Sequence, residues 1–343
     1  MTKTVKIGNV VIGGGAPIAI QSMTNADTCN TEAVVLQIHE LEKCGCEIIR
    51  VAAYNTAAAQ NIKNIKNSIS IPIVADVHFD YRIAIAAIEN GADKVRINPG
   101  NIGSDDKIRK VVDAAKTHHI PIRVGANTGS LKKEYYGGDN SDALVFSAME
   151  NVKILENMNF YDTVISLKSS NVYDTVRAYR KISKMVDYPL HLGVTEAGLY
   201  DTSIIKSSIG IGSLLLDGIG DTMRVSITGD LLDEIHAAKS ILKYSGSRDF
   251  GAEIICCPTC ARTTIDVEGL ARKVTEAVKN TDKHLKIAVM GCVVNGPGEA
   301  KGCDIGIAGG KGQGILFIKG EPVKRNLNED QMLEELLNYI KIL

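Results

Sequence analysis

The chain has 343 residues, of which 45% are hydrophobic and 23% charged, and its formal net charge is −1. This length allows one large or two ordinary globular domains, and the near-zero charge gives no overall signal for nucleic acid or a membrane surface. Eight unevenly placed cysteines do not suit a disulfide scaffold, and no apolar run reaches the ~18 residues of a membrane span.

The absence of tryptophan argues against a stacking platform for single-stranded nucleic acid. The first residues, MTKTVKI, lead into an alternating pattern without the apolar core of a signal peptide. We therefore expect a cytoplasmic protein in a reducing compartment, with neither a nucleic acid nor a membrane as a partner.

Residues 4–12 alternate between apolar and polar side chains around Gly8 and Asn9, which predicts a hairpin that closes the bottom of a barrel. Eight short β-branched runs follow, at Pro17–Met23, Glu47–Ala53, Ile71–Val77, Asp93–Pro99, Ile120–Ala126, Asp162–Lys168, Pro189–Thr195 and Asp221–Ile227. Segments with helical periodicity separate them, and one of these begins at Thr31. This alternation, repeated eight times over ~230 residues, is typical of a (β/α)8 TIM barrel.

The alternative architecture for such a series is a doubly wound open sheet. Eight units and the lack of an early GxGxxG fingerprint argue against it. We assign residues 1–242 to a barrel domain that binds substrate and residues 243–251 to a linker. The pattern of residues 252–343 predicts a small α+β domain, with strands at 252–256, 286–290, 304–308 and 314–318 and helices at 268–279 and 329–343.

The last domain carries a candidate metal centre. Cys257 and Cys260 lie in the sequence CPTC, and Cys292 and Glu299 lie in GCVVNGPGE. Three thiolates suit the soft iron of an iron–sulfur cluster, and a carboxylate as fourth ligand would be held less firmly, which favours a catalytic cluster. A zinc site, a thioredoxin-like redox pair and buried structural thiols remain alternatives.

The other cysteines are weaker candidates. Cys256 directly precedes Cys257, so it does not have the two-residue spacing of Cys257 and Cys260. Cys303 is a spare candidate that could take the place of Glu299 as a ligand. Cys29, Cys44 and Cys46 lie in apolar surroundings, so we expect them to be small buried hydrophobic residues.

Charged and polar side chains collect at the predicted carboxyl ends of the barrel strands, where TIM barrels place their chemistry. An arginine or lysine occurs at five of the eight ends, and a charge inside an apolar strand is costly to bury unless it faces a polar site. Convergent cations with amide and hydroxyl donors predict a pocket for a dense anion, most simply two phosphates. The candidate residues are Arg50, Asp76, His78, Arg96, Asn98, Arg123, Asn127, Lys168, Arg224 and Ser226.

Glu196, in the sequence VTEAG, is an acidic residue within this cationic mouth. It is a candidate acid–base catalyst, or alternatively a salt-bridge partner of Lys168 or Arg224. Asp76 and His78, in ADVHFD, could orient substrate hydroxyls.

Together, the motifs ADVHFDYR, VRINPGNIG, TEAG, CPTCART and GCVVNGPGE resemble those of the 4-hydroxy-3-methylbut-2-en-1-yl diphosphate synthase family, in order and over nearly the whole chain. The resemblance implies a barrel followed by a [4Fe-4S] domain, in the shorter bacterial form. It implies Cys257, Cys260, Cys292 and Glu299 as cluster ligands and Glu196 near the reacting carbon. The diphosphate ligands that it implies are Arg50, Arg96, Asn98, Arg123, Asn127, Lys168, Arg224 and Ser226.

The family's reaction opens 2-C-methyl-D-erythritol 2,4-cyclodiphosphate reductively, with electrons from flavodoxin or ferredoxin. The resemblance also implies a homodimer in which one chain's cluster domain closes over its partner's barrel. The competing hypotheses are a zinc-dependent barrel lyase or hydrolase acting on a phosphorylated sugar, and a non-enzymatic binding module held together by a metal.

Overall fold

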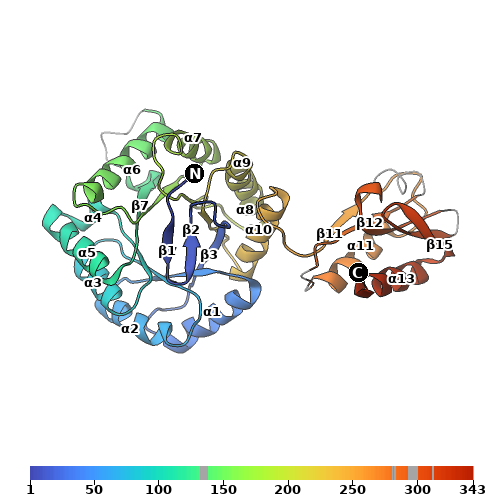
Figure 1. Cartoon of the computed structure of the whole chain (residues 1–343), viewed down its shortest axis with the longest axis horizontal. Helices are drawn as coiled ribbons and strands as arrows, with labels where there is room; N and C mark the ends of the chain where they lie inside the picture. Colours follow the sequence, from blue (N-terminus) through green and yellow to red (C-terminus); the bar gives the residue numbers. More distant parts are fainter. Residues whose placement is uncertain (132–137, 280, 282, 293–299, 311–312, 343) are drawn as a thin grey trace. The chain divides into compact units, whose positions relative to one another are not determined.

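The computed structural model describes residues 1–131, 138–279, 281, 283–292, 300–310 and 313–342. The chain divides into two compact units, Met1–Arg248 and Asp249–Leu343 (Figure 1). Within the described ranges, no helix is both long and apolar enough to cross a membrane.

The first unit is an eight-stranded parallel barrel. Its strands follow the order β8-β7-β6-β5-β4-β3-β10-β9, and a parallel bridge between Ile165 and Leu190 joins the two ends of that series. The strands are β3 (Ala19–Met23), β4 (Ile48–Ala52), β5 (Ile73–Asp76), β6 (Lys94–Arg96), β7 (Ile122–Asn127), β8 (Thr163–Lys168), β9 (His191–Leu192) and β10 (Thr222–Met223). All eight predicted strands are confirmed, although β9 and β10 are much shorter than their apolar runs.

Helices form a ring outside these strands (Figure 1). They are α1 (Thr31–Cys44), α2 (Thr56–Lys66), α3 (Tyr81–Glu89), α4 (Pro99–Ile102), α5 (Asp105–His118), α6 (Asn140–Glu156), α7 (Val172–Ile182), α8 (Tyr200–Ser207), α9 (Ser213–Leu216) and α10 (Leu231–Tyr244). Many begin at an Asn or Asp whose side chain accepts a backbone N–H bond, as Asn30 does for α1. The first helix begins at Thr31 as predicted.

A hairpin closes the amino end of the barrel. Strands β1 (Val5–Ile7) and β2 (Val10–Ile12) pair antiparallel, with Gly8 in the left-handed region at the turn. The buried Val5, Ile7 and Ile12 pack against the first residues of the barrel strands, including Ile48 and Val164. This packing confirms the predicted bottom plug, and it buries apolar surface that would otherwise face water.

The second unit is a five-stranded sheet in the order β11-β12-β13-β14-β15. Its strands are β11 (Glu253–Cys256), β12 (Lys286–Met290), β13 (Ile305–Ala308), β14 (Gly314–Ile318) and β15 (Glu321–Leu327). Strands β11, β12 and β13 pair in parallel. Strand β14 pairs antiparallel with β13, and β15 pairs antiparallel with β14. Helices α11 (Val267–Val278) and α13 (Glu329–Ile342) bury Leu270, Val274 and Leu336 in its core.

Strand β15 was missing from the predicted pattern. Its sequence EPVKRNL is largely exposed, and it is an edge strand of the sheet. Proline and charged residues are typical of such edges, because they discourage pairing with another chain. The same residues removed the hydrophobic signal by which a strand is recognised in a sequence.

Candidate active site

Candidate residues on strands β5 to β8 form three register pairs. Asp76 of β5 pairs with Arg96 of β6, Arg96 pairs with Arg123 of β7, and Asn127 pairs with Lys168 of β8. Because side chains alternate between the two faces of a strand, residues paired in this way project to the same side. The parallel ladder therefore gathers the predicted charges in the carboxyl half of the barrel.

Asp76 is the anionic centre of this group. Its Oδ1 accepts a 2.9 Å bond from Nη1 of Arg96, and its Oδ2 lies 3.7 Å from both Nε of Arg50 and Nε2 of His78. Burial alone would raise the pKa of Asp76, but the charge of Arg50, the nearby ring of His78 and the charge of Arg96 hold it well below 3.8. Asp76 thus fixes two arginines in place.

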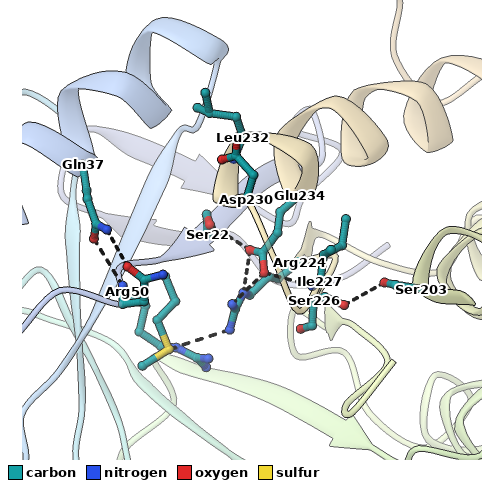
Figure 2. Close-up of polar contacts among 12 residues, drawn as sticks. Ser22, Gln37, Arg50, Ser203, Arg224, Ser226, Ile227, Asp230, Leu232 and Glu234 are labelled. Carbon is teal, nitrogen blue, oxygen red and sulfur yellow. Dashed lines mark hydrogen bonds and ion pairs between the residues drawn. The ribbon is translucent and has the colours of Figure 1, made fainter. Parts of the chain in front are cut away.

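Arg224 has a partner that sequence reasoning missed. Glu234 of α10 is buried and accepts two bonds from Arg224, from Nε at 3.1 Å and Nη2 at 2.9 Å (Figure 2). The same carboxylate also accepts bonds from the Ser22 hydroxyl and the Ile227 amide. This two-pronged geometry orients the guanidinium rigidly. An acidic residue in the first turn of the last barrel helix was the available signal.

A thioether lies between two of the arginines. Sδ of Met23 accepts hydrogen bonds from Nε of Arg50 at 3.0 Å and from Nη1 of Arg224 at 3.7 Å (Figure 2). Burial lowers the pKa of Arg50 to about 10, with Asp76 opposing that shift, so its guanidinium remains charged at neutral pH.

Arg123 and Lys168 differ from the other cations. Nε and Nη1 of Arg123 are buried without a hydrogen-bond partner, and no described carboxylate forms an ion pair with Arg123 or Lys168. Burial, followed by the neighbouring arginines, lowers the pKa of Lys168 well below 10.5. A Cβ at Gly193 would lie 3.2 Å from Nζ of Lys168, so glycine leaves room for the ammonium group. Uncompensated cations of this kind are suited to an anionic ligand.

The polar candidates partly organise the loops. The side-chain oxygens of Asn98 and Asn127 accept bonds from the amides of Gly100 and Gly129, and Asn98 caps α4. The Ser226 carbonyl accepts a 2.7 Å bond from the Ser203 hydroxyl (Figure 2). His78 is exposed and lies 3.4 Å from Nη1 of Arg96. Ligand binding by these four residues remains a prediction.

Glu196 has an unusual backbone. Its φ is 52°, in the left-handed region that a non-glycine residue avoids at a cost of about 1–3 kcal/mol. The side chain is exposed, and in the described part of the chain it forms no ion pair with Lys168 or Arg224. The salt-bridge alternative is thus without support, while strain of this kind is concentrated at functional sites.

Two candidate thiols lie at adjacent strand ends in the second unit. Cys257 directly follows β11 and Cys292 follows β12 by one residue, and these strands pair in parallel with Cys256 opposite Val289. The Gly291 amide donates a 3.1 Å bond to Sγ of Cys257. This bond holds the Cys257 sulfur beside the end of β12, where the chain leads to Cys292.

The loop with the third thiol, Cys260, is tied to the same strand end. The amide and hydroxyl of Thr264 both donate to the Gly291 carbonyl, and the Cys260 amide donates to the Thr263 hydroxyl. A Cβ at Gly291 would lie 2.9 Å from the Thr263 methyl, so glycine permits this close approach. Among the described residues, no three His, Cys, Asp or Glu side chains are already grouped as metal ligands. Glu299 lies outside the described residues.

The donor set nevertheless fits an iron–sulfur group, because three thiols come from two loops that are bonded to each other. Cys257 is half-buried, Cys260 exposed and Cys292 buried. Cys256 is exposed, and Cys303 is buried in an apolar cluster with Met290 and Phe317.

The three upstream cysteines do not all match the expectation of burial. Cys46 is buried, and desolvation raises the pKa of its thiol to about 12, while Cys44 is half-buried. Cys29 is exposed, so the prediction was wrong for that residue. It lies in the loop before α1, where Tyr54 donates a 3.4 Å bond to its sulfur.

The fold and its polar residues define a class, namely two-domain proteins in which a TIM barrel with a cationic mouth precedes a small thiol-bearing α+β domain. The model of the GcpE TIM-barrel domain matches residues 2–239, and the model of the GcpE protein C-terminal domain matches residues 253–342. The chain therefore belongs to the GcpE family.

Curated relatives match over the full length. The 4-hydroxy-3-methylbut-2-en-1-yl diphosphate synthase (flavodoxin) of Fusobacterium nucleatum is 57% identical over 99% of this chain and 96% of its own. The protein of the same name from Caldanaerobacter subterraneus is 56% identical over 99% of this chain and 97% of its own. A dihydropteroate synthase structure from Stenotrophomonas maltophilia covers 72% of this chain and 100% of its own, with a TM-score of 0.54 and 15% identity. That last likeness concerns the fold alone.

Proposed function

We propose that this chain is a flavodoxin-dependent 4-hydroxy-3-methylbut-2-en-1-yl diphosphate synthase. In this reaction, 2-C-methyl-D-erythritol 2,4-cyclodiphosphate takes up two electrons and protons, its ring opens, and water leaves. Membership of the GcpE family and the names of relatives that are 56–57% identical carry this assignment. The relatives named above give no support to a zinc-dependent lyase or hydrolase.

The barrel mouth would bind the two phosphates. Arg50, Arg96 and Arg224 are held by the buried carboxylates of Asp76 and Glu234, so their guanidinium groups are oriented before a ligand arrives. Arg123 and Lys168 lack a carboxylate partner among the described residues, so an incoming phosphate would supply their counter-charge. Preorganised cations of this kind also stabilise the charge on a departing diphosphate oxygen.

Glu196 would donate the proton to the hydroxyl that leaves as water. Its exposed carboxyl group and strained backbone support this role, because a general acid must reach the substrate from a fixed position. His78 and Asp76 would orient substrate hydroxyls beside Arg96, since His78 and Arg96 already lie within 3.4 Å of each other.

The cofactor we propose is a [4Fe-4S] cluster held by Cys257, Cys260 and Cys292, with Glu299 as the fourth ligand. When bound, it would supply the two electrons one at a time. The thiols' part is to hold it, and the bond from the Gly291 amide to Sγ of Cys257 positions that sulfur beside the strand end that leads to Cys292. Backbone bonds to ligand sulfurs are among the features that set the potential of such centres.

We further propose that the enzyme acts in the cytoplasm as a homodimer in which the cluster domain of one chain serves the barrel of its partner. Flavodoxin, named in the relatives' descriptions, would be the electron donor. Support for the dimer comes from the motif resemblance.

Anaerobic purification provides the test. We expect a brownish protein whose visible absorbance is bleached by dithionite and which converts the cyclodiphosphate when supplied with reduced flavodoxin. A colourless protein that contains stoichiometric zinc, or a cluster-loaded protein that leaves the cyclodiphosphate unchanged, would refute the assignment.

A further inference from the structure

A lysine that the sequence analysis did not single out lies beneath the cationic mouth. Lys94 of β6 pairs in register with Val74, which belongs to the apolar layer above the hairpin, and Arg96 two residues later pairs with Asp76. Because alternate residues of a strand face the same side, Lys94 projects into the barrel interior, one step below Arg96. It is 0% exposed.

The Lys94 ammonium group has no protein partner in this position. Among the residues that the structure describes, none accepts a hydrogen bond from Nζ of Lys94. A buried ammonium without a partner is costly, and a lysine responds by releasing its proton. Burial, and then the charges of Arg123 and Arg50, accordingly lower the pKa of Lys94 well below 10.5.

The surroundings of Lys94 are strongly cationic. The charged and titratable groups of the described interior are Arg50 on β4, Asp76 on β5, Arg96 on β6, Arg123 on β7, Lys168 on β8, Tyr179 on α7, His191 on β9, Arg224 after β10 and Glu234 on α10. His78, which follows β5, lies at the mouth beside Arg96. Strand β3 contributes the uncharged Gln21 and Met23. Counting Lys94, six cationic side chains thus face two carboxylates, and each carboxylate already binds an arginine.

His191 does not offset this charge. Its ring is fully buried, with Nδ1 2.8 Å from the Thr222 hydroxyl, and burial followed by the charge of Arg123 lowers its pKa well below 6.5. The guanidinium groups remain protonated at ordinary pH. Lys94 and Lys168 are therefore the cations of this group whose charge can respond to a ligand.

We infer that Lys94 binds a proton from solvent when a diphosphate enters the mouth, so that substrate binding is coupled to proton uptake inside the barrel. The inference rests on the proposed function, because it takes the cyclodiphosphate as the ligand. The anion supplies negative charge that the interior lacks and so favours the ammonium form of Lys94. Since protons are taken up on binding, the association constant falls as pH rises through the affected range.

The cyclodiphosphate itself neither takes up nor releases protons in the neutral range. Each phosphorus of the cyclodiphosphate is linked to the carbon skeleton through an ester oxygen and to the other phosphorus through the bridging oxygen, which leaves one strongly acidic hydroxyl per phosphorus. Both are ionised throughout the neutral range, so the ligand does not titrate there. Proton uptake on binding must then occur on the protein.

The test is isothermal titration calorimetry of cluster-loaded protein with the cyclodiphosphate, without reductant so that turnover cannot occur. At each pH of a series through the neutral and mildly alkaline range, two buffers of different ionisation enthalpy give the number of protons taken up. We expect uptake by the wild type and up to one proton less in Lys94→Met. We also expect affinity about fivefold or more weaker in that variant, with a flatter pH dependence.

Variants of matched side-chain length separate the effect of the Lys94 charge on binding from the effect of its shape. Lys94→Met keeps the length of the side chain, and an apolar replacement of a buried, unpaired amine should preserve the thermal midpoint. Lys94→Gln serves the same purpose if Lys94→Met does not fold. Lys168→Met measures how much of the proton uptake occurs on Lys168, the lysine that we propose contacts phosphate directly. Equal proton uptake by wild type and a folded Lys94 variant overturns the inference alone. Failure of the wild type to bind the cyclodiphosphate overturns the proposed function as well.

Discussion

The two units hold their candidate functional groups in different ways. In the barrel, Arg50, Asp76, Arg96 and Arg123 belong to the strands themselves, and the parallel ladder sets their relative positions. In the second unit, the candidate thiols lie beyond the strand ends, and a few loop bonds to Gly291 hold them. The barrel site is thus positioned by the fold, while the thiol site depends on loop contacts and on the group that it would bind.

This difference predicts where each site is vulnerable. Removing one side chain from the mouth leaves the ladder intact and should weaken one interaction. Removing one thiol would take away a proposed ligand that the strands do not replace.

The largest effect is therefore expected at the thiols. Cys257→Ala, Cys260→Ala or Cys292→Ala should abolish cluster assembly and activity, because each removes a thiolate ligand. Iron and sulfide content and the visible spectrum provide the measurement. Cys256→Ser and Cys303→Ala are the matched controls and should keep the cluster. A cluster lost in Cys303→Ala but retained with full activity in Glu299→Ala would show that the fourth ligand is wrongly assigned.

The second effect separates binding from chemistry at Glu196. Glu196→Gln keeps the shape of the side chain but has no titratable proton, so turnover should fall by roughly 10²–10⁴-fold, the range that a general acid supplies. Substrate affinity should hold or rise slightly, because a negative charge near two phosphates is removed. Single-turnover rates and dissociation constants of the cluster-loaded variant decide the matter, and near-normal turnover would exclude Glu196 as the acid.

The third effect is on stability. Asp76→Asn should destabilise the barrel by about 3 kcal/mol at pH 7, because it leaves Arg50 without its buried counter-charge. Since the folded pKa of Asp76 is lowered, its contribution is fully present above the unfolded value near 3.8 and is lost as pH falls towards the folded value. Unfolding midpoints of wild type and variant should therefore converge below about pH 4. A constant difference across that range would contradict the role of the Asp76 charge.

The smallest effect concerns single contacts in the mouth. Arg123→Ala or Arg224→Ala should weaken substrate binding by about 1.5–3 kcal/mol, the scale of a hydrogen bond to a charged group, with the cluster spectrum unchanged. Arg224→Ala should be the less stable of the two variants, because it leaves the carboxylate of Glu234 buried without its cation. No described carboxylate is paired with Arg123, so Arg123→Ala leaves none unpaired. Unaltered affinity in both variants would rule out the proposed anion pocket.

The barrel could be predicted because its buried parallel strands are short apolar runs bounded by polar residues. Edge strand β15 escaped because its proline and charges hide the strand pattern. Glu234 could not be assigned to the site because it lies on a helix, and a helix residue gives no sign in the sequence of which strand its carboxylate will reach.

The position of Lys94 has a signal in the sequence. In the sequence DKVRI, Lys94 and Arg96 are separated by the strand period, so both had to face the same side. A pair of charges on the inner face of one strand indicates a polar interior that extends below the strand end. The left-handed backbone of Glu196 had no comparable signal in its sequence, VTEAG, because tertiary context imposes it.

The hairpin at the amino end of the barrel has an electrostatic consequence. Its buried Val5, Ile7 and Ile12 form a layer of low dielectric constant between the interior cations and the solvent below. Field lines from those cations are therefore focused through the open carboxyl mouth, which raises the local concentration of anions there. The small apolar plug should thus accelerate the capture of a dianionic ligand, and added salt should slow that capture by screening the field.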